Sequence, residues 1–451
     1  MKENISNSVR ALKAFFNTGA TKNVKFRIAQ LKRFKATIVA NKKLIEQALW
    51  QDLHKSPEEA YLTEIALVLG EIDYHIKHLK RWSRPKRVST PLFMLPSSSH
   101  IVYEPLGVAL IIAPWNYPFQ LTMNPLVGAI AAGCCAMVKP SPSSKATSEV
   151  MDKIIREAFD PTYVDMIHGN RDVNALLLAE RYDIIFFTGS PALAKIVAQA
   201  AAQYLTPTVM ELGGKSPCII DKGANVKLAA KRIIWGKLLN GGQTCVAPDY
   251  LLVHSDLKAA VVAEMKNEIA KMFGDTKTSR FYPRIINDTA FERLKSLLSD
   301  GRIIYGGTTD ATERYIEPTL IDAVKPTDKI MQEEIFGPLL PILEFKEMTE
   351  AYAFVAEREK PLAFYYFGTN KNEALLNSTA GGTCINDTIM HVSNHHLPFG
   401  GVGNSGMGRY HGHESFKAFS NHRAVVTTPT WIDLPFKYVP FKGFGLVKKL
   451  M

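Results

Sequence analysis

Residues 106–139 read LGVALIIAPWNYPFQLTMNPLVGAIAAGCCAMVK. One apolar run opens this stretch, a second ends it, and a helical stretch separates them. Neither run alternates between apolar and polar residues, which is typical of strands buried on both faces of a parallel sheet. Two more runs of this kind, at residues 184–187 and 208–212, continue the pattern. The segment therefore predicts a doubly wound α/β unit.

The same pattern returns between Ser216 and about Cys384, which predicts a second α/β unit. Its apolar runs lie at residues 217–220, 250–253 and 363–368, and a helical stretch lies at residues 257–273. Upstream, residues 12–82 predict long amphipathic helices that serve as scaffold. Residues 84–104 are richer in Pro and Ser and predict a strand or hairpin excursion at a subunit contact.

The composition is that of a globular protein. With 451 residues, of which 46% are hydrophobic and 22% charged, the chain is long enough for two or three domains. No apolar run reaches the roughly 18 residues of a membrane span. The first residues lack the apolar core of a secretory signal, so we expect a cytoplasmic protein.

Charge and cysteine usage narrow the functional classes. The net charge of +11 suits nucleic acid, an anionic membrane surface or an anionic ligand. No nucleic-acid-binding signature accompanies it, so we expect no nucleic-acid partner. The five cysteines are odd in number and show no CxxC spacing, which argues against a disulfide framework and a zinc site. A cysteine with a special role is therefore expected to be a reactive thiol.

Residues 240–248, NGGQTCVAP, place such a thiol at Cys245. The two preceding glycines leave room for a substrate, and backbone N–H groups in such a turn can point at the sulfur. A buried cysteine in a turn is the alternative for this stretch taken alone. The surrounding segments favour a nucleophile.

Two of these segments end apolar strands with side chains suited to acyl chemistry. In residues 210–215, MELGGK, an apolar strand ends on Glu211, a candidate general base, for which an ion pair with Lys215 is the alternative. Residues 113–118, APWNYP, hold Asn116, whose amide can donate to an oxyanion. An ordinary turn asparagine is the alternative there.

Two further segments suit a nucleotide. Lys139 and Ser141 offer a cation and a hydroxyl at the end of a strand. Residues 187–190, FTGS, open a helix after a strand, where free N–H groups and the helix dipole favour phosphate. A plain strand-turn-helix junction would look the same.

Together and in this order, the segments resemble the signature segments of the aldehyde dehydrogenase superfamily, from about Val102 to Phe419. Residues 334–338, EIFGP, and 398–406, PFGGVGNSG, match as well. The short N-terminus and the chain length resemble the class 3 or fatty-aldehyde branch, whose members are usually homodimers. The resemblance implies oxidation of a small-molecule aldehyde, medium to long-chain aliphatic or aromatic, to a carboxylic acid with NAD or NADP.

The resemblance also implies a role for each matching position. Cys245 would be the nucleophile that carries the thiohemiacetal and thioester, Glu211 the general base, and Asn116 the side-chain donor of the oxyanion hole. No metal is expected. The positions expected to bind the cofactor are Trp115, Lys139, Ser141, Gly189, Ser190, Leu212, Glu334 and Phe336.

The implied fold is aldehyde dehydrogenase-like: a Rossmann-type cofactor domain, an α/β catalytic domain and a small β oligomerisation element. We predict that residues 1–83 and 105–209 form the cofactor domain and residues 210–409 the catalytic domain. Residues 84–104 and 410–430 would form the oligomerisation element, and residues 431–451 a basic aromatic tail.

Two departures bear on the cofactor. Where the family often has a glycine four or five residues after Gly189, this chain reads Pro191-Ala192-Leu193-Ala194, so helix packing at the pyrophosphate is expected to differ. Three residues after Lys139, where many relatives carry a glutamate that accepts from the ribose, this chain has Pro142. No carboxylate there repels a 2′-phosphate, so NADP is not excluded.

Alternatives remain at this point. His391, His395 and His396 suggest a metal, but the stretch does not look helical, and the entrance to the substrate site or plain surface is favoured. A CoA-acylating or phosphorylating relative is the nearest enzymatic rival, and Glu211 favours water instead. A basic surface-binding protein without activity is the rival from another class, supported by net charge alone.

The segment from Trp431 to Met451 combines aromatic residues with lysines, which suits a membrane interface. Its prolines and glycines forbid a continuous helix before about Leu446, so we expect peripheral contact rather than a span. Packing on the protein or on a dimer partner is the alternative. In the fatty-aldehyde branch such extensions sit near the substrate entrance, and we expect the same here.

Overall fold

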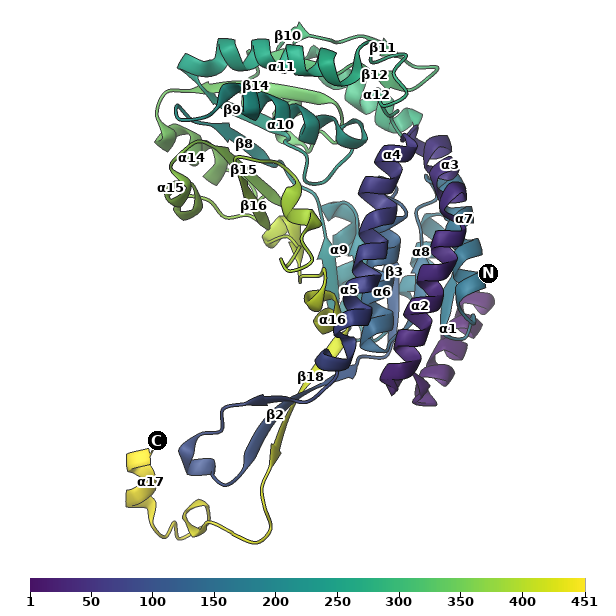
Figure 1. The fold of residues 1–451 in the computed structure, drawn as a ribbon, viewed down its shortest axis with the longest axis vertical. Coiled ribbons are helices and arrows are strands. Elements are labelled where there is room, and N and C mark those ends of the chain that lie inside the picture. Colours follow the sequence, from purple (N-terminus) through teal and green to yellow (C-terminus); the bar gives the residue numbers. More distant parts are fainter. Residues whose placement is uncertain (451) are drawn as a thin grey trace.

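The structure, a computed structural model, describes residues 1–450. Three parts follow one another along its long axis: two α/β units, each built on its own sheet, and a narrow arm that carries the C-terminal tail (Figure 1). Within the described range, no helix combines the length and apolarity that a membrane crossing requires.

The first unit is built on a sheet with the strand order β17-β7-β6-β3-β4-β5. Strands β3 to β7 are parallel, and β17 pairs antiparallel with β7. The chain adds β4 and β5 on one side of β3 and then β6 and β7 on the other. It changes direction at β3 and β6, whose carboxyl ends meet at the crevice where open sheets bind ligands. The bounds are β3 Val108–Ile112, β4 Cys135–Lys139, β5 Val164–Met166, β6 Ile184–Thr188, β7 Thr208–Glu211 and β17 Gly406–Met407.

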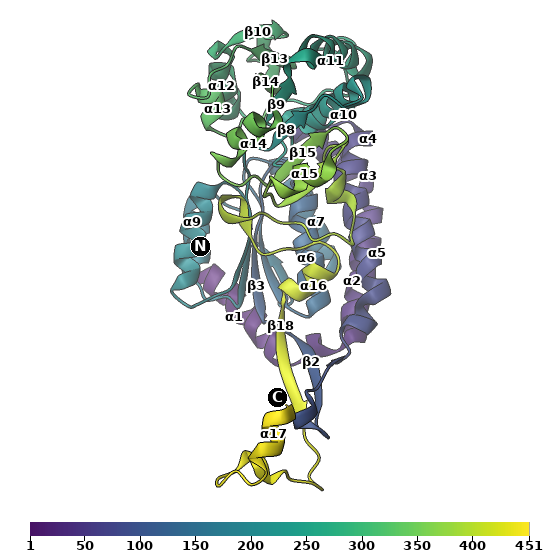
Figure 2. The ribbon, with the colours of Figure 1, turned by 90° about the vertical axis from the view of Figure 1, so that its left-hand side faces the viewer.

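Helices cover both faces of this sheet (Figure 2). Helices α1, α8 and α9 lie on one face and α6 and α7 on the other, where α2, α3 and α5 form an outer layer. The amphipathic helices predicted upstream are present, and the first begins at Lys2. The bounds are α1 Lys2–Asn17, α2 Val24–Ala40, α3 Lys42–Leu53, α4 Pro57–Ala60, α5 Ala66–Trp82, α6 Gln120–Ala132, α7 Lys145–Ala158, α8 Arg171–Leu178 and α9 Pro191–Ala202.

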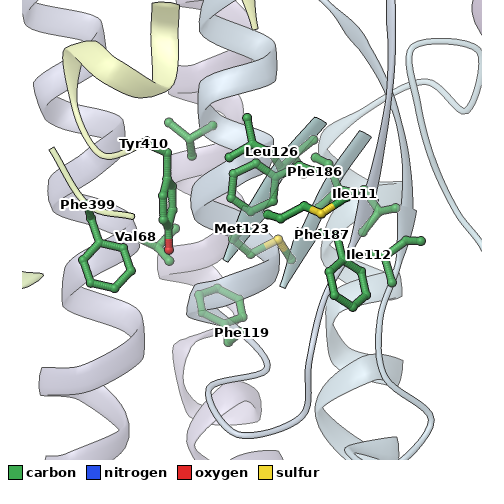
Figure 3. Close-up of a cluster of buried hydrophobic side chains, with 14 of the residues drawn as sticks. Val68, Ile111, Ile112, Phe119, Met123, Leu126, Phe186, Phe187, Phe399 and Tyr410 are labelled. Carbon is green, nitrogen blue, oxygen red and sulfur yellow. The ribbon is translucent and has the colours of Figure 1, made fainter. Parts of the chain in front are cut away.

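An apolar core joins β3, β6 and α6 to a late segment of the chain (Figure 3). Phe186 of β6 packs against Tyr410, with ring centroids 5.0 Å apart, and Tyr410 in turn packs against Phe399 at 5.7 Å. The backbones of Phe399 and Tyr410 also pair, through two hydrogen bonds of 2.9 and 3.0 Å. The late segment is thereby fixed to the first sheet.

The second unit is built on a sheet with the order β10-β13-β14-β9-β8-β15-β16, in which β10 runs antiparallel to its neighbour β13. The predicted α/β fold class is therefore confirmed. The strands are β8 Pro217–Ile220, β9 Tyr250–His254, β10 Arg302–Tyr305, β13 Thr319–Asp322, β14 Leu339–Phe345, β15 Ala363–Phe367 and β16 Gly382–Ile385. A separate pair is β11 Thr309–Asp310 with β12 Tyr315–Ile316, and the helices are α10 Val226–Leu238, α11 Lys258–Phe273, α12 Asp288–Ser296, α13 Lys329–Gln332, α14 Met348–Ala356 and α15 Lys371–Leu376.

The arm is a three-stranded antiparallel sheet of β1 Lys86–Val88, β2 Ser98–Pro105 and β18 Ser420–Thr427. The tail turns back along its end and closes with α17 Phe444–Leu450 (Figure 1), so helix begins two residues before the predicted limit at Leu446. Part of the tail packs on the arm, because Ile432, Leu434 and Phe436 share a small cavity with residues 93–97.

The predicted division into domains stays a prediction, and two segments lie elsewhere than it implies. Strand β17, assigned to the catalytic segment 210–409, joins the first sheet. Helix α16, His413–Ala418, assigned to the oligomerisation element, packs on α6. The positions of β17 and α16 agree with the packing of Phe399 and Tyr410 on the core of the first unit.

Candidate active site

The loop that carries Cys245 is held in an unusual backbone conformation. Asn240, Gly241 and Gly242 all have positive φ angles, of 54°, 61° and 76°. A side chain on Gly242 would come within 2.2 Å of the Gly337 carbonyl oxygen, so the loop lies directly against the EIFGP segment. The glycines therefore serve the close approach of two backbones as well as the turn.

Gln243 fixes this loop from within. Its side-chain amide donates to the carbonyl oxygens of Asn240 at 3.0 Å and Arg284 at 3.1 Å. Its side-chain oxygen accepts from the Ile286 N–H at 3.0 Å. The Gln243 side chain is fully buried and out of reach of water. Its polar atoms therefore depend on these three hydrogen bonds.

Cys245 lies where two cavities meet. The first, called the apolar cavity here, has a volume of about 450 Å³ and the second, called the polar cavity, about 330 Å³. Leu121, Cys245, Phe399 and Tyr410 border both. Side chains that line the apolar cavity alone include Leu62, Leu67, Trp235, Leu238, Phe273, Phe281, Ile389 and Val392.

Two carboxyl groups flank the thiol at the polar cavity. Glu211 ends β7 and is 2% exposed, and within residues 1–450 neither of its carboxylate oxygens has a hydrogen-bond partner. Burial raises the pKa of Glu211 well above its usual value, and Arg409 opposes the shift. The alternative partner, Lys215, pairs with Asp249 instead. Glu211 is thus an unpaired, buried carboxyl group, and its role as the general base stays a prediction.

Glu334 lies over Gly213, where a side chain would come within 2.1 Å of its carboxylate. Burial and the charge of Asp249 raise the pKa of Glu334 to about 8, while the Gly214 N–H and Lys215 lower it. Like Glu211, it borders the polar cavity.

These surroundings keep the thiol neutral at rest. Burial, Glu334 and Glu211 raise the pKa of Cys245 to about 12, against the backbone N–H groups of Cys245 and Val246, which lower it. Those N–H groups lie against the sulfur, where they can also donate to negative charge that develops on a substrate oxygen.

Asn116 is positioned by a buried ion pair. Lys55 donates to Glu64 at 2.5 Å and to the Asn116 carbonyl oxygen at 3.1 Å, and both side chains of the pair are fully buried. The second oxygen of Glu64 accepts from the N–H groups of Phe119 and Gln120 at the start of α6. The ion pair therefore holds this loop at Asn116 and at the start of α6.

The Asn116 amide reaches the loop of Cys245. It donates to the Gln243 carbonyl oxygen at 3.1 Å, and Asn240 donates back to the Asn116 carbonyl oxygen at 2.7 Å. In the part of the chain that is described, this uses one of the two N–H bonds of the amide, and Asn116 also borders the polar cavity.

The polar cavity fits a nucleotide. Of the predicted cofactor residues, Trp115, Gly189, Ser190, Leu212, Glu334 and Phe336 border it, with the rings of Trp115 and Phe336 edge to face at 5.4 Å. Ser190 caps α9, whose first N–H groups open at the crevice beyond β6. Thr188 and Glu334 each keep a buried oxygen that has no hydrogen-bond partner among the described residues. These groups suit ribose hydroxyls and a pyrophosphate.

Two predicted cofactor residues do not border this cavity as it stands. The Lys139 ammonium is buried and donates to the Pro140 carbonyl oxygen at 2.7 Å, and burial lowers its pKa to about 8. Ser141 lies at the turn before α7, where its carbonyl oxygen accepts from Ser148. Their role in binding stays a prediction.

The three histidines take separate partners. His391 contacts the Cys384 sulfur at 3.1 Å, His395 the Glu71 carboxylate at 2.8 Å, and His396 the Tyr74 hydroxyl at 3.2 Å. They hold their segment on α5 and β16, while their neighbours Met390, Val392 and Ser393 line the apolar cavity. Among residues 1–450, no three His, Cys, Asp or Glu side chains are grouped to hold a metal ion.

Sequence reasoning missed several residues of the site. Phe399 and Tyr410 form a wall between the two cavities, although Phe399 falls in a matching motif. Arg293 borders the polar cavity and donates to the backbone of Glu334 and Ile335. Thr188 lies in the predicted FTGS segment but was not among the predicted cofactor residues, although its position at the end of β6 was an available signal.

Comparison with known proteins agrees with this geometry. Residues 1–425 match the aldehyde dehydrogenase family. The 4,4′-diaponeurosporen-aldehyde dehydrogenase of Staphylococcus aureus is 46% identical, over 96% of this chain and 95% of that protein. Aldehyde dehydrogenase family 3 member B1 of Mus musculus is 43% identical, over 98% and 96%. The dimeric NADP-preferring aldehyde dehydrogenase of Canis lupus familiaris is 43% identical, over 97% and 98%.

A solved structure, the substrate-bound state of Staphylococcus aureus AldH, superposes with a TM-score of 0.96 at 44% identity and covers 99% of each chain. These relatives agree with the resemblance to class 3. The chain therefore belongs to the aldehyde dehydrogenase family and is an oxidoreductase that converts aldehydes to acids with NAD or NADP.

Proposed function

We propose that the enzyme oxidises medium to long-chain aldehydes to carboxylic acids through a thioester on Cys245. The observation that carries this proposal is the position of Cys245 between a cavity lined by apolar side chains and a cavity suited to a nucleotide. An apolar chain gains free energy from burial in the first cavity, by about 0.8 kcal/mol for each methylene group. The name of the Staphylococcus aureus relative specifies 4,4′-diaponeurosporen-aldehyde, which supports a large aldehyde substrate over a small one.

The proposed chemistry uses this chain's groups in order. The Cys245 thiol releases its proton to solvent, its sulfur attacks the aldehyde carbon, and the Asn116 amide with the Cys245 N–H stabilises the oxyanion of the thiohemiacetal. The bound cofactor supplies the acceptor for the hydride that the former aldehyde carbon loses, which leaves a thioester. Glu211 then takes a proton from a water molecule, the oxygen attacks the thioester carbon, and the acid leaves as the thiol is restored.

The unpaired Glu211 carboxyl supports hydrolysis over transfer to a second thiol or to phosphate. A raised pKa makes its carboxylate a stronger base for a proton of water. Retention of Cys245, Asn116 and Glu211 around one point also weighs against an inactive surface-binding protein.

Replacing Glu211 by Gln separates the two halves of the reaction. We expect Glu211→Gln to keep a pre-steady-state burst of reduced cofactor while steady turnover falls by roughly a hundredfold or more, because only hydrolysis needs the base. Stopped-flow absorbance of the reduced cofactor measures both phases. Cys245→Ser is the control and should lose both while still binding cofactor. A burst that collapses together with steady turnover would refute the assigned role.

We also propose that the enzyme accepts NADP. Pro142 is exposed at the turn between β4 and α7, next to the hydroxyl of Ser143, and Lys145 begins the helix whose N-terminus favours an anion. The name of the canine relative, which is NADP-preferring, agrees with this choice.

Placing a carboxylate at this turn should shift the choice of cofactor. Pro142→Glu is expected to raise the ratio of kcat/KM for NAD over NADP by roughly tenfold, because its charge repels a 2′-phosphate. Steady-state kinetics with each cofactor measures the ratio, with Pro142→Gln as the uncharged control. An equal ratio in both variants would show that the ribose lies elsewhere.

We propose a homodimer assembled through the arm. Strand β18 forms one edge of the arm sheet, and its eight residues are largely exposed in the chain by itself. Unprotected edges of this kind invite pairing with another chain. The canine relative is named as dimeric. Sedimentation as a 50.2 kDa particle would contradict this proposal.

Contact of the tail with a membrane surface is a separate proposal. Trp431 and Phe444 are exposed, by 76% and 59%, and Lys442, Lys448 and Lys449 lie close by in the chain. Within one chain, no described residue after Thr430 lines the apolar cavity, and the arm holds the tail away from both units (Figures 1 and 2). The expectation that tail and substrate entrance share a location therefore does not hold within one chain.

Vesicle flotation tests the tail directly. The full chain is expected to float with vesicles that contain phosphatidylserine at low salt and to be released by salt, since each lysine near the surface contributes about 1 kcal/mol. A variant ending at Thr430 should stay at the bottom of the gradient, and vesicles of phosphatidylcholine serve as the neutral control. If the full chain floats with neither, the tail is a packing element only.

A further inference from the structure

The apolar cavity carries two acidic side chains and, among its lining residues in the range 1–450, no basic one. Glu58 and Glu59 both line it, although the chain as a whole has a net charge of +11. The two acids differ in their surroundings, and that difference decides what the cavity can admit.

Glu58 is neutralised by an ion pair. Its side chain is about half exposed, and its carboxylate accepts from Arg280 at 2.8 Å. The Arg280 guanidinium in turn lies over the ring of Phe281, 4.2 Å from the centroid, at the lining of the same cavity. An exposed pair of this kind presents little net charge to a substrate.

Glu59 has no such partner. One carboxylate oxygen accepts from the Asn240 N–H at 2.7 Å, and the same stretch of wall holds Tyr117, Thr244 and Cys245. Lys55, whose charge acts on Glu59, lies against the Tyr117 ring, 4.0 Å from its centroid, and is already paired with Glu64. The charge of Glu59 is therefore only partly offset, and its side chain lines the same cavity as Cys245.

We propose that Glu59 is a specificity-determining residue that excludes aldehydes with an anionic group on the chain and admits uncharged ones. A carboxylate brought past Glu59 meets a like charge in a cavity lined mainly by apolar side chains, where Coulomb repulsion is less screened than in open water. No cation in the lining compensates it. The proposal rests on the proposed function, in which the apolar cavity receives the substrate chain.

The exclusion should depend on pH. Burial raises the pKa of Glu59 to about 7, with Glu64 adding to the shift and Lys55 and the Asn240 N–H opposing it. A carboxyl group with that pKa is charged above pH 7 and neutral below it. Discrimination against an anionic aldehyde is therefore expected to strengthen as the pH rises through 7.

The test compares an aldehyde that ends in a carboxylate with its methyl ester of equal chain length. For the wild-type enzyme we expect kcat/KM to favour the ester by roughly a hundredfold or more at pH 8 and by less at pH 6. Glu59→Gln keeps an oxygen to accept from Asn240 and should lower this preference at least tenfold at pH 8, with little pH dependence left. Glu59→Asp, the matched control that keeps the negative charge at this position, should leave the preference near the wild-type value.

The outcomes separate this proposal from the one on which it depends. An ester that is oxidised well, with a preference that neither Glu59→Gln nor pH changes, would overturn the role of Glu59 and leave the proposed function intact. A wild-type enzyme that oxidises neither compound contradicts the substrate class itself. Because the pH series uses the wild-type protein, the result does not depend on the folding of the variant.

Discussion

Asn116 makes two hydrogen bonds that join its loop to the loop of Cys245, next to a third between the hydroxyls of Tyr117 and Thr244, and the rest of the site depends on them. Asn116 donates to the Gln243 carbonyl oxygen and accepts from the Asn240 side chain, so each loop fixes the other. One loop follows β3 of the first sheet and the other lies between β8 and β9 of the second. This pair of bonds therefore brings groups from both α/β units to one point, where a nucleophile and an oxyanion donor must lie within reach of the same carbon.

Burial raises the pKa values of the carboxyl groups and of the thiol at this point. Glu211 and Glu334 lie beside the thiol with few partners, so their carboxyl groups stay weak acids and the thiol stays protonated in the protein alone. A fully solvated site would lose this property, because water would stabilise the charged forms. The wall of Phe399 and Tyr410, fixed to the core of the first unit, lies between the apolar cavity and the polar one.

Local pattern predicted the parts of the site that lie at strand ends. The runs before Asn116, Glu211 and the FTGS turn are strands β3, β7 and β6, because buried parallel strands have a compositional signature of their own. Lys55 and Glu64 could not be predicted in this way, because a lysine and a glutamate in a helical scaffold give the same sequence pattern whether their ion pair is buried or exposed. The docking of residues 399–418 on the first unit was missed for a related reason. Contacts between segments that are distant in the sequence produce no periodic pattern of apolar residues.

Formation of a thioester on Cys245 is the central claim, and mass spectrometry of the enzyme during turnover tests it most directly. The Glu211→Gln enzyme, mixed with NAD(P) and a medium-chain aldehyde, quenched in acid and digested, should yield a Cys245 peptide heavier by the acyl group. The added mass should disappear on treatment with hydroxylamine, which cleaves thioesters. An unmodified Cys245 peptide together with full formation of reduced cofactor, or an acyl group on another residue, would contradict the account.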